Sequence, residues 1–95
     1  MDDYKPEVDL ERQVERPAKA YAKERGWWLA KFTSPGLNGV PDDIFIRNGV
    51  VIFIEFKRPG GELRPQQVKR IREMREHGAK VHVIDNLGDA YALLK

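Results

Sequence analysis

The stretch VVIFIEFKRPGG, Val50 to Gly61, decides the fold of this 95-residue chain. Its first five residues are all apolar, a pattern typical of a strand that is covered on both faces. Glu55 and Lys57 then follow, two positions apart, before a Pro-Gly-Gly turn ends the run. Charged groups are costly to remove from water, so their place at the end of the most apolar strand needs an explanation.

The dipeptide Asn48-Gly49 separates this strand from the apolar stretch before it. Asn-Gly between apolar runs predicts a β-hairpin, because a type I′ turn needs positive φ at both central residues. With a two-residue loop, Arg47 pairs with Val50 and Asp42 faces Glu55. A symmetric four-residue loop gives the same pairs, whereas a three-residue loop with a bulge would shift them.

Side chains alternate between the two faces of a strand, so this register places both carboxylates on one face. Opposed residues have Cβ atoms about 4.5–5.5 Å apart, and like charges at that distance destabilise the sheet. A shared proton, an arginine, a lysine or a divalent cation has to offset the repulsion. The predicted face carries Asp42, Ile44, Ile46, Val51, Phe53, Glu55 and Lys57.

Two interpretations of this face remain open. Lys57 could be the counter-charge of an internal ion triad with a purely structural role. Alternatively, Asp42, Glu55 and the backbone carbonyl of Phe56 form half of the oxygen shell that Mg²⁺ prefers. A bound divalent ion activates water near neutral pH, and a nearby lysine stabilises developing negative charge. The second interpretation therefore predicts phosphodiester hydrolysis.

The rest of the chain predicts an α/β fold with the order α-β-β-β-α-β-α, in which helices flank a mixed sheet. One domain spans residues 1–95, and residues 1–8 are expected to be a loose tail. Pro17 is expected to kink the first helix or to divide it in two. Besides the hairpin, the predicted elements are helices at 9–25, 65–77 and 89–94, strands at 27–33 and 80–85, and a loop at 34–41.

Composition excludes several classes of protein. Cysteine is absent, which excludes disulfides, thiolate metal sites and a cysteine nucleophile. The charged N-terminal segment does not fit a signal peptide, and no apolar run approaches the ~20 residues of a membrane span, so we expect a cytoplasmic protein. A domain of this size buries only roughly 60–65% of its unfolded surface, which makes pairing with a second copy a natural source of stability.

The net charge of +2 does not indicate a binding partner, but the distribution of the charged residues along the chain is informative. Basic residues dominate between Lys57 and Lys80, as on a phosphate-binding surface or on an ordinary solvated helix face. Binding through such charge would weaken steeply with salt and show little sequence preference. The candidate DNA contacts in this segment are Arg58, Arg64, Lys69, Arg72 and Arg75, of which the last three share roughly one helix face.

Pro41-Asp42 followed after a hairpin by Glu55-Phe56-Lys57 resembles the PD-(D/E)xK nuclease signature. With a helical glutamate before it and Leu63–Gln67 opening a helix after it, the pattern resembles the VRR-NUC (virus-type replication–repair nuclease) domain. The resemblance runs from about Leu10 to Asp85, and it is greatest to the stand-alone bacteriophage members. It implies a restriction-endonuclease-like core.

By this resemblance, Asp42 and Glu55 are metal ligands and Lys57 is the catalytic lysine. Glu11 would be the helical glutamate, which binds the metal directly or through a water, with Glu15 as the alternative. Gln67 matches the family's glutamine, although it could also be an ordinary exposed residue of a first helical turn. The family also has a lysine near the place of Lys31, which would line the site and contact DNA.

The family implies a Mg²⁺- or Mn²⁺-dependent, structure-selective DNA endonuclease of DNA repair. Stand-alone members are similar to Holliday-junction resolvases and act as homodimers on four-way junctions. Two alternatives remain: a non-catalytic module that binds branched DNA, and a nuclease that prefers flaps or nicked DNA. A structural domain with an internal ion triad is a third. The candidates for a dimer surface, or for core packing, are Trp27, Trp28, Phe32 and Leu37.

Overall fold

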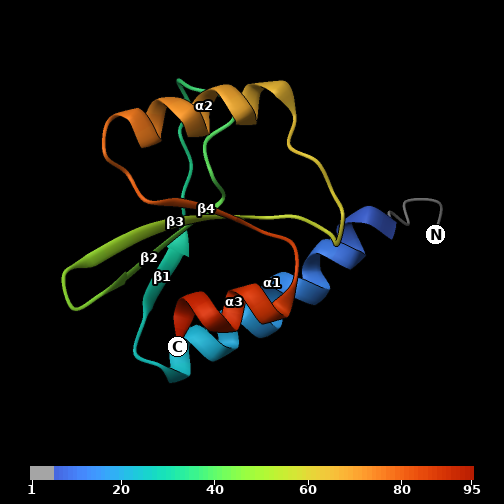
Figure 1. Cartoon of the computed structure of the whole chain (residues 1–95), viewed down its shortest axis with the longest axis vertical. Helices are drawn as coiled ribbons and strands as arrows, with labels where there is room; N and C mark the ends of the chain where they lie inside the picture. The colour runs from blue at the N-terminus through green and yellow to red at the C-terminus, as the bar shows by residue number, and fades with distance from the viewer. Residues whose placement is uncertain (1–5) are drawn as a thin grey trace.

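The computed structural model describes the backbone of residues 6–95 and the side chains from Leu10 onward. The element order α-β-β-β-α-β-α confirms the prediction (Figure 1). Within the described residues, no helix is long and apolar enough to cross a bilayer. The elements are α1 (Pro6–Glu24), β1 (Trp28–Lys31), β2 (Asp43–Arg47), β3 (Val50–Phe56), α2 (Pro65–Glu76), β4 (Val81–Ile84) and α3 (Leu87–Leu94).

The four strands form one mixed sheet in the order β1-β2-β3-β4. The first three strands are antiparallel, and β4 runs parallel to β3 because α2 carries the chain back across the sheet. Helices α1 and α3 lie on one face of the sheet and α2 lies on the other (Figure 1). The mixed sheet with flanking helices confirms the predicted fold class.

The hairpin between β2 and β3 has the predicted register. Asn48 and Gly49 have φ values of 51° and 81°, as a type I′ turn requires. Arg47 pairs with Val50, and the pairing continues to Asp43 opposite Ile54. One step further along both strands, Asp42 comes beside Glu55.

The hydrophobic core fills the space between the sheet and the pair α1 and α3. Trp27 belongs to it, and its Nε1 donates a 2.9 Å hydrogen bond to the carbonyl of Leu94. The sequence left open whether Trp27 belongs to a dimer surface or to the core, and its burial places it in the core. The buried members of this core are Val14, Ala18, Ala22, Trp27, Phe45, Ile52, Ile54, Phe56, Ile84, Ala90 and Leu94.

Helix α1 is one element that continues through Pro17, so the alternative of two separate helices is wrong. Proline in a helix interior costs one backbone hydrogen bond, and the buried stripe of Val14, Ala18 and Ala22 offsets this loss by packing on the sheet. The helix begins at Pro6, so residues 6–8 of the expected loose tail are helical. The part of that tail in residues 1–5 lies outside the described residues.

The loop between β1 and β2 is docked on the start of α2. Gly39 has a φ of +89°, and a Cβ added there would lie 2.4 Å from the carbonyl oxygen of Gln66. Only glycine allows so close an approach of two backbones. The same loop accepts a 2.8 Å hydrogen bond at the Asn38 carbonyl from Nε of Arg70. These contacts fix the segment that leads into Asp42.

Candidate functional site

Glu55 lies at the centre of the candidate site, near the end of β3. Its residue is only 2% exposed, so its carboxylate needs partners from the protein. The backbone N–H of Asp42 donates a 3.2 Å hydrogen bond to Oε1 of Glu55. The pairing predicted from the hairpin therefore brings Asp42 and Glu55 together.

Gln67 holds the other oxygen of this carboxylate. Its Nε2 donates a 3.1 Å hydrogen bond to Oε2 of Glu55, and its Oε1 accepts a 2.9 Å hydrogen bond from the backbone N–H of Arg64. The second bond caps the first turn of α2. Gln67 is half-buried rather than exposed, so it joins the start of α2 to the site.

Lys57 reaches the same place from the end of β3. Its Nζ lies 3.8 Å from Oε2 of Glu55, and its side chain is largely buried. Beside it opens a cleft of about 560 Å³. The cleft is lined by Glu11, Lys57, Arg58, Gly60, Gly61, Glu62 and Arg64.

The structure distinguishes the two helical glutamates. Glu11 lines the cleft, where burial raises its pKa, with Lys57 opposing and the charge of Asp42 adding to the shift. Glu15 lies one turn further along α1 and is bound to lysines outside the cleft. Glu11 is therefore the glutamate that shares the electrostatic environment of Asp42 and Lys57.

Burial and the negative charge of Asp42 raise the pKa of Glu55 to about 7, while Lys57 opposes the shift. The charge of Glu11 adds to the same effect, so the site carries an excess of negative charge. Hard divalent cations bind through one or two carboxylates together with waters and substrate oxygens. This oxygen-rich, electronegative site fits such an ion.

Across the described residues, no three carboxylate or imidazole side chains converge as a ready-made ion site. The candidate ligands are therefore the pair Asp42 and Glu55 with the Phe56 carbonyl, and Glu11 lies at the edge of the cleft. Water and phosphate oxygens would complete the coordination, which is the usual manner for Mg²⁺.

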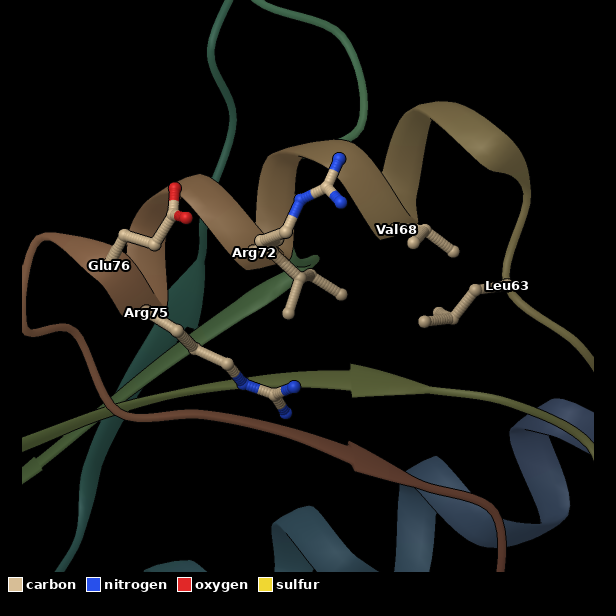
Figure 2. A pocket seen from close by; sticks show the side chains of 6 residues that line it. Leu63, Val68, Arg72, Arg75 and Glu76 are labelled. Atoms are coloured by element: carbon tan, nitrogen blue, oxygen red, sulfur yellow. The ribbon is translucent and has the colours of Figure 1, made fainter.

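The candidate DNA-binding residues fall into two groups. Arg58 and Arg64 line the cleft beside Lys57, and Lys69 and Arg72 are exposed on α2. Arg75 instead reaches from α2 toward the strands, whereas Arg72 stays beside the helix (Figure 2). Nε and Nη2 of Arg75 lie 3.1 Å and 2.7 Å from the carbonyl oxygen of Val81, to which they donate hydrogen bonds. Because these two hydrogen bonds hold the guanidinium against β4, we leave Arg75 out of the proposed DNA surface.

Lys31 lies on the other face of the sheet from Glu55. It pairs across the strands with Asp43, and its Nζ donates a 3.0 Å hydrogen bond to Glu15. Its ion pairs are with Glu15 and Asp43, so we leave it out of the proposed DNA surface, and its place beside the site stays a prediction. Strand alternation places Lys31 on the same face of the sheet as Asp43 and on the opposite face from Asp42.

The sequence interpretation missed two features of the site. One is Asp43, which is fully buried on the face opposite Asp42. The sequence contained an indication of this, because an acidic residue on the core face of a strand requires a counter-charge. The other is Gly39, whose close contact with α2 depends on tertiary packing and leaves no local pattern.

Comparisons of the sequence and the fold with known proteins agree with one another. The sequence model of the VRR-NUC domain matches residues 6–86. The protein named "Putative nuclease p44" of Acyrthosiphon pisum secondary endosymbiont phage 1 is 34% identical over 77 residues, which cover 80% of this chain and 83% of that protein. A solved structure described as a VRR_NUC domain superposes with a TM-score of 0.80 at 27% identity and covers 88% of this chain and 92% of its own.

Proposed function

Because this chain belongs to the VRR-NUC nuclease family, we propose that it is a divalent-metal-dependent, structure-selective DNA endonuclease that resolves four-way junctions as a homodimer. The phage relative supports a place of action in the cytoplasm of a host cell. The observation that carries the proposal is the convergence of Asp42, Glu55 and Lys57 beside the cleft. Gln67 binds the same carboxylate.

Asp42, Glu55 and the backbone carbonyl of Phe56 would hold the cation, and Glu11 would hold it through a water. A Mg²⁺ or Mn²⁺ ion would neutralise charge on the phosphodiester and make a nucleophilic hydroxide available near neutral pH. Gln67 orients the Glu55 carboxylate from the opposite side to Asp42. This orientation is established before substrate arrives, which spares the reorganisation that catalysis would otherwise require.

Lys57 acts on the phosphate itself. Its stem is buried and its Nζ stays 3.8 Å from Glu55, so the ammonium is held at the wall of the cleft. A fixed positive charge at this point stabilises the negative charge that develops on the phosphoryl oxygens as the bond to the leaving oxygen breaks. An internal ion triad would need no cleft, and here the cleft opens directly at the lysine.

DNA would follow the basic residues from the cleft onto α2. Arg58 and Arg64 contact the phosphates nearest the site, and Lys69 and Arg72 contact those further along the strand. Contacts of this kind position the backbone without reading the sequence, which is consistent with selection of a DNA shape.

Dimerisation is supported by an apolar part of the sheet on the side of α2. Trp28, Ile46 and Val51 are direct neighbours across β1, β2 and β3, so they share one face. Trp28 is 60% exposed and Val51 is 41% exposed. We propose that this face pairs with a second copy, because a two-fold dimer gives the two sites that a symmetric junction requires.

The decisive test is a cleavage assay on flaps, forks, nicked duplexes and four-way junctions with Mg²⁺, Mn²⁺ or EDTA. We expect the wild type to cut the four-way junction at two symmetric positions. Glu55→Ala and Lys57→Ala should abolish cleavage while they retain junction binding. Full activity of Glu55→Ala, or activity in EDTA, would reject the site. Binding without cleavage in either metal would favour the non-catalytic module.

The dimer has its own test in sedimentation equilibrium. The wild type should sediment as a dimer, and Trp28→Glu should sediment as a monomer that still folds, because Trp28 lies outside the core. Tyr91→Glu is the matched control, since Tyr91 is exposed on α3, which covers the other face of the sheet. A wild-type monomer at micromolar concentration would reject the dimer.

A further inference from the structure

A closed ring of four charges lies on the face of the sheet opposite the candidate site. It consists of Glu15 and Lys19 from α1, Lys31 from β1 and Asp43 from β2. Going around the ring, the N–O distances are 2.7 Å for Lys19–Glu15, 3.0 Å for Glu15–Lys31, 3.7 Å for Lys31–Asp43 and 2.9 Å for Asp43–Lys19. Each charge thus has two partners of opposite sign.

The ring is a poor source of stability. The side chain of Asp43 is fully buried, those of Glu15 and Lys19 are 15% and 20% exposed, and that of Lys31 is 64% exposed. Among the described residues, neither oxygen of Asp43 accepts a hydrogen bond of good geometry, so the ion pairs are its main compensation. Buried ion pairs are often no more stable than apolar side chains of similar volume. Stability alone therefore does not account for four charges at this position.

Each segment that contributes to the ring also carries a residue of the candidate site or a direct contact to one. Glu15 lies one turn after Glu11 on α1, and Asp43 directly follows Asp42. On β1, Lys31 precedes Phe32, whose backbone N–H donates a 2.7 Å hydrogen bond to the carbonyl of Asp42. The ring therefore links α1, which carries Glu11, to the start of β2, which follows Asp42, and to the end of β1, which is bonded to Asp42 through Phe32.

We propose that Lys19 is a positioning residue of the nuclease site: with Glu15, Lys31 and Asp43 it sets the rotation and height of α1 so that Glu11 stands opposite Asp42 across the cation site. This inference rests on the proposed function. Lys19 is the central member, because it is the one that bridges the helix and the buried Asp43 at short distance. Buried charged groups give directional contacts, whereas an apolar contact lets a helix rotate or slide at little cost.

The double variant Lys19→Met/Asp43→Leu tests this proposal. It removes one positive and one negative charge, keeps the Glu15–Lys31 pair and replaces the buried ions by apolar side chains of similar size. We expect its melting temperature in EDTA to equal or exceed that of the wild type. The Mn²⁺ or Mg²⁺ concentration that gives half of the cation-induced rise in melting temperature should increase roughly 10-fold, as when groups behind a metal ligand are removed.

Two further variants separate positioning from simple loss of charge. Lys19→Arg keeps the charge and should keep a half-saturating metal concentration close to that of the wild type. Lys23→Met removes a lysine one turn later on the exposed side of α1 and should change nothing. In cleavage assays the double variant should lose kcat, while the KM for the junction stays unchanged, because the DNA-binding arginines lie elsewhere.

The outcomes distinguish the two proposals. If the wild type cuts junctions and the double variant keeps the same metal dependence, the positioning role of Lys19 is wrong and the nuclease assignment stands. If the wild type does not cut, the cation-induced change in melting temperature still decides: a response lost in the double variant supports the positioning role. If the wild type neither cuts junctions nor changes its melting temperature with Mg²⁺ or Mn²⁺, both proposals are overturned.

Discussion

The side-chain amide of Gln67 donates a 3.1 Å hydrogen bond to Oε2 of the buried Glu55. This bond joins the first turn of α2 to the end of β3, two elements on different parts of the chain. The same glutamine caps α2 through its other atom, so one side chain serves both the fold and the site. Gln67 is therefore a suitable position at which to test the charge of the site.

Gln67→Glu should make the metal-free protein less stable and more responsive to cations. The new carboxylate would lie against Glu55, where a second negative charge is unfavourable without a counter-ion. We expect a lower melting temperature in EDTA and a larger rise with Mg²⁺ than in the wild type. Gln66→Glu is the matched control, because Gln66 is exposed in the same helical turn. An equal response of the two variants would contradict the bond to Glu55.

Glu55 should make the metal-free protein less stable at higher pH. Its folded pKa is raised from 4.5 to about 7, so the folded state holds its proton in a range where the unfolded state has lost it. The free energy of unfolding therefore falls as pH rises from about 4.5 to about 7, by at most about 3 kcal/mol from this group. Above that range, the contribution of this group to the free energy of unfolding is fully lost.

The measurement is urea unfolding in EDTA at pH 5 and pH 8 for the wild type and Glu55→Gln. The variant cannot ionise at this position, so its stability relative to the wild type should be higher at pH 8 than at pH 5. Asp43 also has a raised pKa, but it is present in both proteins and is not among the groups that act on Glu55, so its contribution cancels in the difference. The charge of Glu11 is one cause of the raised pKa of Glu55, so its effect is part of what the comparison measures. The same difference at both pH values would contradict the raised pKa.

Gly39→Ala should disrupt the loop that leads into Asp42. A Cβ at this position would meet the backbone of Gln66 at 2.4 Å, in a conformation with positive φ. We expect a loss of about 2 kcal/mol or more, together with weaker cleavage. Gly36→Ala in the same loop is the control, because its Cβ would meet nothing within 4 Å. Equal unfolding free energies for the two variants would show that the loop is not docked on α2.

Arg72 and Arg75 should behave differently although they lie on one helix. Arg75→Met should lower stability by about 1–2 kcal/mol, because the Val81 carbonyl loses its hydrogen bonds from the guanidinium. Arg72→Met should leave stability unchanged and weaken junction binding, with the slope of log K against log salt reduced by about 1. Thermal unfolding and binding at several salt concentrations test both. Reversed effects would contradict the proposed DNA surface.

The sequence predicted the fold closely because its signals were local. Asn48-Gly49 set the hairpin register, and continuing that pairing to the start of β2 placed Asp42 beside Glu55. The sequence was less informative about which side chains of different helices and strands face one another. Lys31 pairs with Asp43, so its side chain forms ion pairs on the face of the sheet opposite Glu55, which the sequence alone did not indicate. The partners of Gln67 and Arg75 depend on where α2 docks, and no local pattern records that position.

The parallel pairing of β3 with β4 has a consequence for the order of folding. The hairpin that carries Asp42 and Glu55 needs only a short turn, whereas the parallel pair forms after the whole crossover through α2 has closed. We therefore expect Asp42 and Glu55 to come together early in folding, before the hydrogen bond from Gln67 to Glu55 can form. During synthesis, the proposed metal site would be complete only after β4, the last strand, has emerged from the ribosome.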